Sequence, residues 1–142
     1  MIVGLIVNPV AGLGGAVALK GSDGPDIQAR ALALGAVPRA AERAAAALRA
    51  LRARRPDVLV RTVAGAMGED SARAAGVPYR LAHRPAATSG GTAGSGALST
   101  GAADTRAAST GPADTRAAVA ALGEVDLLLF AGGDGTARDV LD

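Results

Sequence analysis

The residues best suited to chemistry stand near the end of the chain, in the run Gly-Gly-Asp-Gly-Thr at 132–136. Asp134 offers a single carboxylate, and the glycines around it allow backbone N–H groups to approach a ligand closely. An apolar run over 127–131 precedes this turn, and a stretch that can be helical follows it. A glycine turn between a strand and the start of a helix is a compact device for holding phosphate.

A second glycine turn lies near the N-terminus. The apolar segment 2–7 predicts a buried first strand, which ends in a turn and a glycine-rich loop with the sequence Asn8-Pro9-Val10-Ala11-Gly12-Leu13-Gly14-Gly15. Both turns follow predicted strands, so in a parallel sheet both lie at the carboxyl edge, where such folds bind ligands. The sequence therefore predicts one site shared by the two turns.

The remaining segments supply the elements that would position these turns. Apolar runs predict strands over 58–63 and 79–82, and a fully buried parallel strand over 127–131. Helices are predicted over 27–34 with Asp26 as N-cap, over 38–54 and over 68–75. The polar residues of the second helix recur at helical spacing and are expected to face water: Arg39, Glu42, Arg43, Arg49 and Arg52. The alternation of strands and helices indicates an α/β, Rossmann-like layered domain with a parallel sheet.

Residues 86–112 differ in character from the rest. Alanine, threonine, serine and glycine dominate, which predicts a low-complexity, disordered insertion. The decamer at 99–108 recurs almost unchanged at 109–118, and a duplication that lengthens a surface loop explains two copies better than a solenoid does. The second copy leads into a helix before the last strand. Asp114 and Thr115 are interpreted as the start of that helix, with one of the two as its cap, rather than as site residues.

Composition limits the class of protein. The 142 residues amount to one domain, with 15 basic and 13 acidic residues and a net charge of +2. The chain has one phenylalanine, one tyrosine and no tryptophan, and no basic stripe, which argues against nucleic acid as a partner. No cysteine is present and no apolar run reaches the ~18 residues of a membrane span, so we expect a cytoplasmic protein without a membrane partner. Homo-oligomerisation is left open.

Other interpretations of the polar residues stay open. The run from Gly12 begins like a dinucleotide fingerprint but lacks its third glycine, and the chain has no Gly-Lys-Ser/Thr of a P-loop. Asp134 could be a simple turn aspartate, because Asp-Gly is a common turn pair. Lys20 and Asp23 could bind phosphate or metal, or belong to a solvated loop. His83 lies far from both turns in sequence and is expected to be a loop or strand-end residue.

Taken together, the two turns resemble those of the NAD kinase and diacylglycerol kinase superfamily. Longer details are similar to one branch, the predicted ATP-NAD kinases related to a protein of acetoin catabolism: Gly12–Gly15, Leu19–Gly24, Asp114–Arg116 and Phe130–Asp139. The similarity covers most of the chain outside 86–108. It implies the N-terminal α/β domain of such a kinase over 1–142, and a mostly β second domain that would follow and is absent from this sequence.

The resemblance also implies an activity. Phosphoryl transfer would run from ATP or polyphosphate, with Mg²⁺, to a hydroxyl group, which in NAD kinases is the 2′-hydroxyl of the adenosine ribose of NAD. Asp134 would engage that hydroxyl as base or orienter. The nucleotide would be bound by the turn residues Asn8, Gly12, Gly132, Gly133, Gly135 and Thr136, and no residue is assigned to the metal.

Two alternatives accompany this hypothesis. Diacylglycerol-type kinases carry the same two motifs, so the chain could belong to a lipid or other small-molecule kinase. It could also be a non-catalytic, truncated remnant that binds nucleotide. We expect the 142-residue chain alone to be an incomplete enzyme, because the resemblance assigns much of the nucleotide site to the second domain.

Overall fold

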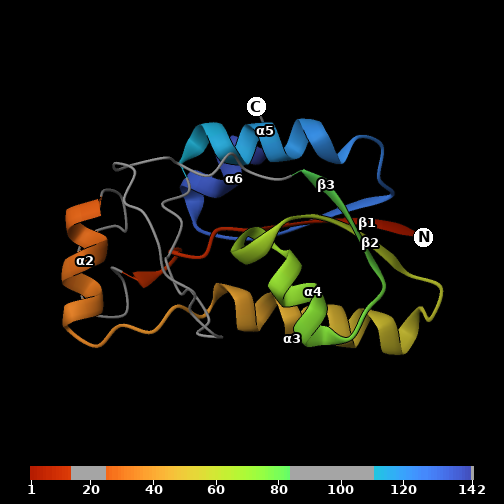
Figure 1. Cartoon of the computed structure of the whole chain (residues 1–142), viewed down its shortest axis with the longest axis horizontal. Helices are drawn as coiled ribbons and strands as arrows, with labels where there is room; N and C mark the ends of the chain where they lie inside the picture. Colours follow the sequence, from red (N-terminus) through yellow and green to blue (C-terminus); the bar gives the residue numbers. More distant parts are fainter. Residues whose placement is uncertain (14–24, 84–110, 142) are drawn as a thin grey trace, which may run out of the picture.

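The computed structural model describes residues 1–13, 25–83 and 111–141. Lys20, Asp23 and the first copy of the decamer, 99–108, lie outside the described residues, as does most of the expected 86–112 insertion. The described part forms an α/β fold with helices on both faces of a sheet, as the sequence predicts (Figure 1).

Four parallel strands make the sheet: β1 (Ile2–Val7), β2 (Leu59–Val63), β3 (Tyr79–His83) and β4 (Leu127–Ala131). Their spatial order is β3-β2-β1-β4. The chain moves from β1 to β2 and β3 on one side, then crosses back to place β4 on the other side of β1. The point between β1 and β4 is therefore the switch point at which doubly wound sheets bind ligands.

The helices follow the crossovers between strands. After β1 come α2 (Pro25–Ala33) and α3 (Ala40–Arg54); after β2 come a 3₁₀ turn η1 (Gly65–Met67) and α4 (Glu69–Ala75). α5 (Pro112–Leu122) precedes β4, and α6 (Asp134–Leu141) follows it. α3 and α4 cover one face of the sheet, whereas α5 and α6 lie on the other (Figure 1). Among the described helices, none is long and apolar enough to cross a membrane.

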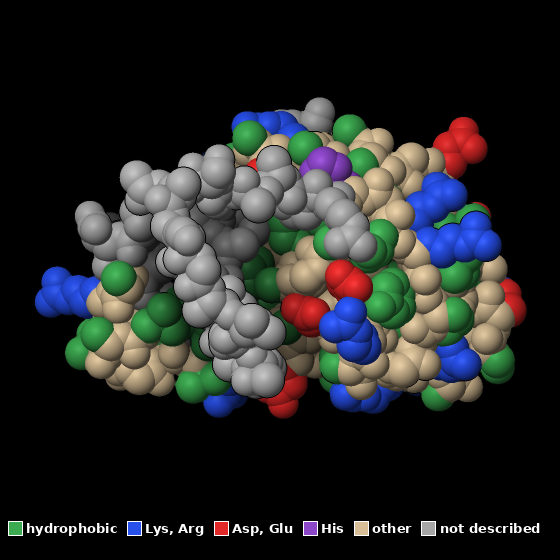
Figure 2. Space-filling view, in the orientation of Figure 1, with side chains coloured by type: hydrophobic (Ala, Val, Ile, Leu, Met, Phe, Trp, Pro, Cys, Tyr) green, Lys and Arg blue, Asp and Glu red, His purple; other side chains and the backbone are tan. Residues whose placement is uncertain are grey.

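Two of the three buried clusters in the described residues pack against the sheet, one on each face. Towards α3 and α4, Leu5 and Val7 of β1 pack against Leu48 of α3 in a fully buried cluster. Towards α5, Ile6 packs with Leu122 in a second cluster. The alternation of β1 side chains between the two faces explains why this strand is apolar throughout. On the face shown in Figure 2, the described charged side chains of both signs are interspersed with apolar ones.

The prediction that residues 127–131 form a fully buried strand is wrong. In the described part of the chain β4 pairs only with β1, and Leu127 and Phe130 are 49% and 38% exposed. An apolar run satisfies the pattern of a central parallel strand, but position in the sheet depends on which neighbours arrive. The edge position exposes side chains that the composition alone would place inside.

Two helix starts also differ from the predictions. α2 begins at Pro25, so Asp26 lies inside its first turn and is not the N-cap. α5 begins at Pro112, and the last residue of the expected 86–112 insertion is therefore helical, as is most of the second decamer. Proline favours this start because it fits the first turn, where its missing N–H is not needed.

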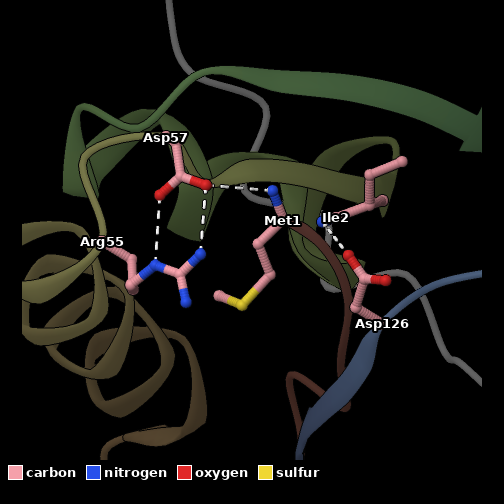
Figure 3. A network of polar contacts seen from close by, with 5 residues as sticks. All are labelled: Met1, Ile2, Arg55, Asp57 and Asp126. Atoms are coloured by element: carbon pink, nitrogen blue, oxygen red, sulfur yellow. Dashed lines mark hydrogen bonds and ion pairs between the residues drawn. The ribbon is translucent and has the colours of Figure 1, made fainter.

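A polar network fixes the first strand at its N-terminal end (Figure 3). The N-terminal amine of Met1 lies 3.2 Å from Asp57 Oδ2, and Arg55 donates to the same carboxylate through Nε and Nη2, both at 3.2 Å. The backbone N–H of Ile2 donates to Asp126 Oδ2 at 2.7 Å. Residues that precede β2 and β4 thereby hold β1, the strand between them.

Stability at acidic pH should depend on Asp57. The hydrogen bond from Arg55, and then that from the N-terminal amine, lower the pKa of Asp57 from 3.8 to about 2. A lowered pKa in the folded state gives a contribution to stability that is present above pH 3.8 and is lost as pH falls towards 2. In Asp57→Asn we expect a small loss of stability at neutral pH and a weaker fall of the melting temperature across this window.

The control for this measurement is Asp70→Asn. Asp70 is about as exposed as Asp57, with side chains 54% and 56% accessible, but its contact with Arg73 is longer, at 3.5 Å. Thermal melts at pH 7, 4, 3 and 2 would compare the variants. Equal pH dependence in wild type and Asp57→Asn would show that this carboxylate is not coupled to folding.

Candidate functional site

The two glycine turns meet at the carboxyl edge of β1 and β4. The strands are paired up to Val7 and Ala131, and the backbone N–H of Asn8 donates to the carbonyl oxygen of Ala131 at 2.8 Å. The turn after β1 and the turn after β4 therefore leave the sheet side by side. The predicted meeting of two turns at one edge is what the structure shows.

Asn8 joins the two turns through its side chain. Its Nδ2 donates to Thr136 Oγ1 at 3.0 Å, and its Oδ1 accepts the N–H of Val10 at 3.2 Å. Thr136 is only 3% exposed, so its hydroxyl oxygen accepts this bond inside the fold, where water has little access. A side-chain amide suits this position because it donates to one turn and accepts from the other.

The glycines of the second turn divide into two kinds. A Cβ atom on Gly132 would lie 2.5 Å from Thr136 Cγ2 and would overlap the rest of that side chain, so the turn closes only with glycine there. A Cβ atom added to Gly133 or to Gly135 would meet no other atom within 4 Å. In the first turn Gly12 has a φ of +78°, and a Cβ atom added there would also meet no other atom within 4 Å. The open glycines leave room for a ligand to approach the backbone.

Asp134 is the first residue of α6 and is exposed. The helix begins at once, since the N–H of Ala137 donates to the carbonyl oxygen of Gly133 at 3.0 Å. A pair between Arg116 Nη1 of α5 and Asp139 Oδ1, 2.8 Å long, holds α6 against α5.

A cavity of about 810 Å³ opens beside the turns. This volume is within the range of pockets that hold small-molecule ligands. Its walls are the start of the β1 loop, the segment before α3, one face of α3 and the end of β4: Ala11, Gly12, Leu34, Gly35, Ala36, Val37, Arg39, Ala40, Arg43, Ala44, Ala47, Leu129, Phe130, Ala131, Gly132 and Gly133.

The predicted site residues take different positions around this cavity. Gly12, Gly132 and Gly133 line it. Asn8 and Thr136 form the hydrogen bond that joins the turns and are not among the lining residues. Asp134 and Gly135 stand at the start of α6, next in sequence to the lining glycines.

Other candidates fall outside the site. His83 ends β3, and β2 separates that strand from β1. Asp114 lies in the first turn of α5, where its carboxylate accepts the N–H of Gly111 at 2.9 Å. The interpretation of Asp114 and Thr115 as part of a helix start is thereby confirmed, but neither of them is the cap, because the N-cap is Gly111. Among the described residues, no three histidine, cysteine, aspartate or glutamate side chains form a group that could hold a metal.

The expectation that the polar residues of this helix face water is confirmed for four of them, which are exposed: Arg39, Glu42, Arg43 and Arg49. It is wrong for Arg52, which is half-buried. Exposure does not keep these side chains away from the site. Arg39 and Arg43 line the cavity. Arg49 Nη2 donates to the carbonyl oxygen of Ala74 at 2.8 Å. Helical spacing shows which residues share one face of a helix, but it does not show which cavity or neighbouring element that face borders. The signal that could have singled out Arg39 and Arg43 is their place at the positive end of a helix, where cations are disfavoured.

The comparisons agree with this architecture. The family model of the ATP-NAD kinase N-terminal domain matches residues 3–142, nearly the whole chain. The searches of curated proteins and of solved structures found no match. A parallel α/β sheet with two glycine turns at its switch point and a match of this extent establish a kinase-type nucleotide-binding domain: the chain belongs to the family of the ATP-NAD kinase N-terminal domain.

Proposed function

We propose that this domain binds the substrates of a phosphoryl transfer from ATP or inorganic polyphosphate to the 2′-hydroxyl of NAD. The observation that carries the proposal is the hydrogen bond between Asn8 and Thr136, which joins the two turns beside the 810 Å³ cavity. Phosphoryl transfer demands chiefly positioning and neutralisation of charge. Glycine backbones, a helix start and one carboxylate supply such a setting.

In this proposal Asp134 contacts the acceptor hydroxyl as base or orienter. Its carboxylate is exposed at the first position of α6 and stands next to Gly133, which lines the cavity. Gly133 and Gly135 leave open space at the backbone, which allows a phosphate or ribose to approach the turn. Asn8 and Thr136 act through the geometry of the two turns.

Mg²⁺ is the metal that this chemistry employs, and the residues present suit it. Magnesium is commonly held by one or two carboxylates together with substrate phosphates, while several waters remain bound. Asp134 supplies one exposed carboxylate at the turn, which fits a metal delivered with the nucleotide. The ion would neutralise charge on the transferring phosphoryl group.

The wider setting is part of the same proposal. The absence of cysteine supports a cytoplasmic location, and the cavity supports small nucleotides, rather than nucleic acid or membrane, as partners. Self-association of the chain belongs to the same proposal, and gel filtration tests it.

The test is formation of NADP from NAD and Mg²⁺ with ATP or polyphosphate as donor. It should be run on the 142-residue chain and on a version extended along the reading frame past residue 142. NADP formation by either protein supports the proposal, and the preferred donor identifies the source of phosphate. A folded, nucleotide-binding extended protein that makes no NADP with either donor would exclude NAD as acceptor. In that case lipids or other small hydroxyl compounds become the acceptors to test.

A further inference from the structure

The wall of the cavity formed by α3 carries two arginines, Arg39 and Arg43, one helical turn apart. The other residues that this helix contributes to the cavity are alanines. The guanidinium groups are therefore the long polar groups that α3 offers to the space. The same cavity is lined by Gly132 and Gly133 of the turn after β4.

The charge along the described lining of this cavity is entirely positive. None of its described lining residues is an aspartate or glutamate. The arginine ion pairs recorded within the described ranges involve Arg55, Arg73 and Arg116, and neither Arg39 nor Arg43 takes part in them. Both side chains are exposed, so their donors are accessible to a ligand in the cavity.

Arg39 and Arg43 stand at the N-terminal end of α3, where a positive charge is unfavourable. Arg39 is the N-cap and Arg43 follows within the next turn, where the helix carries partial positive charge. Glu42, the acidic residue of the first turn, is not among the lining residues. Departures from local rules of this kind are common where a binding site requires them.

We propose that Arg39 and Arg43 form an anion subsite that binds the phosphate chain of a nucleotide or of inorganic polyphosphate. The guanidinium fork matches phosphate oxygens in a bidentate geometry. The subsite lies in the same cavity as the glycine turn, so one phosphate chain could contact both. This inference deepens the proposed function and rests on it, because it specifies which side chains would hold the phosphates.

Calorimetric titration of the 142-residue chain tests the subsite. The probes are ATP, inorganic tripolyphosphate and NAD, and the variants are R39Q, R43Q and R39Q/R43Q. The matched control is R30Q/R54Q, which removes the same charge from two exposed arginines outside the cavity lining. Thermal melts establish whether each variant is folded. If R39Q/R43Q is not folded, the single variants R39Q and R43Q test the subsite.

We expect each substitution at Arg39 or Arg43 to weaken binding of tripolyphosphate and ATP about tenfold, as hydrogen bonds to charged groups warrant. The control should bind like wild type. Weakening that also extends to NAD would assign the subsite to the dinucleotide as well. Unchanged binding of all three probes in R39Q/R43Q would overturn the proposal, as would wild-type protein that binds none of them.

The outcome is separable from that of the proposed function. If R39Q/R43Q loses tripolyphosphate binding while the extended wild-type protein makes no NADP, the subsite stands and NAD is excluded as acceptor. If NADP is made and R39Q/R43Q keeps the wild-type KM for both substrates, the function stands and the subsite is excluded.

Discussion

Replacing Asp134 with asparagine is expected to lower the rate of NADP formation by about 10²–10⁴-fold, the contribution typical of a positioned general base. Asparagine keeps the size and a hydrogen-bonding oxygen but cannot accept the proton of the hydroxyl. Since Asp134 is exposed at the first position of α6, its replacement leaves the core intact. We therefore expect kcat to fall in a protein that stays folded.

Asp139→Asn is the matched control on the same helix. Asp139 accepts from Arg116 at 2.8 Å and holds α6 against α5, whereas Asp134 stands at the sheet edge. Loss of this ion pair should cost about 0.5–1 kcal/mol of stability, with activity largely retained below the melting temperature. Wild-type kcat in Asp134→Asn would exclude a role for this carboxylate in proton transfer.

The second large effect is expected for Gly132→Ala. The added methyl group would overlap the side chain of Thr136, which is 3% exposed and hydrogen-bonded to Asn8. Because Thr136 is β-branched and enclosed, it cannot rotate away without breaking that bond. We expect a loss of about 1–3 kcal/mol in the free energy of unfolding, the usual cost of overpacking, and weaker nucleotide binding.

Gly133→Ala separates packing from ligand access. A Cβ atom at Gly133 meets nothing within 4 Å, so stability should stay within about 0.5 kcal/mol of wild type. Because Gly133 lines the cavity, the methyl group is expected to hinder the approach of a ligand and to lower nucleotide affinity. Chemical denaturation and calorimetry measure the two effects. Equal stability of Gly132→Ala and wild type would contradict the close packing of Thr136 on the turn.

Much of the fold follows from local sequence. The apolar runs at 2–7, 58–63 and 79–82 predict β1, β2 and β3 to within a residue at each end, and 127–131 matches the bounds of β4. A buried parallel strand needs apolar residues on both faces, and such runs stand out in a chain rich in alanine and arginine. Glycine, proline and aspartate mark the turns for equally local reasons.

The packing of these elements does not follow in the same way. The run at 127–131 has the composition of a central strand, yet Leu127 and Phe130 are partly exposed because β4 has β1 as its single described neighbour. The α3 arginines have the spacing of a solvated face, and Arg39 and Arg43 are exposed as that spacing predicts, but it does not show that both also line the cavity. In both cases the sequence pattern identifies a face, and contacts distant in sequence decide what that face meets.

The sequence by itself determined the α/β class, the two glycine turns and their family, because each is encoded within a few consecutive residues. Only the tertiary structure decided the order β3-β2-β1-β4, the hydrogen bond between Asn8 and Thr136, and the cavity that unites α3 with the second turn. The bonded pair is 128 residues apart in the chain. Such contacts arise from the packing of the whole sheet, which no local pattern specifies.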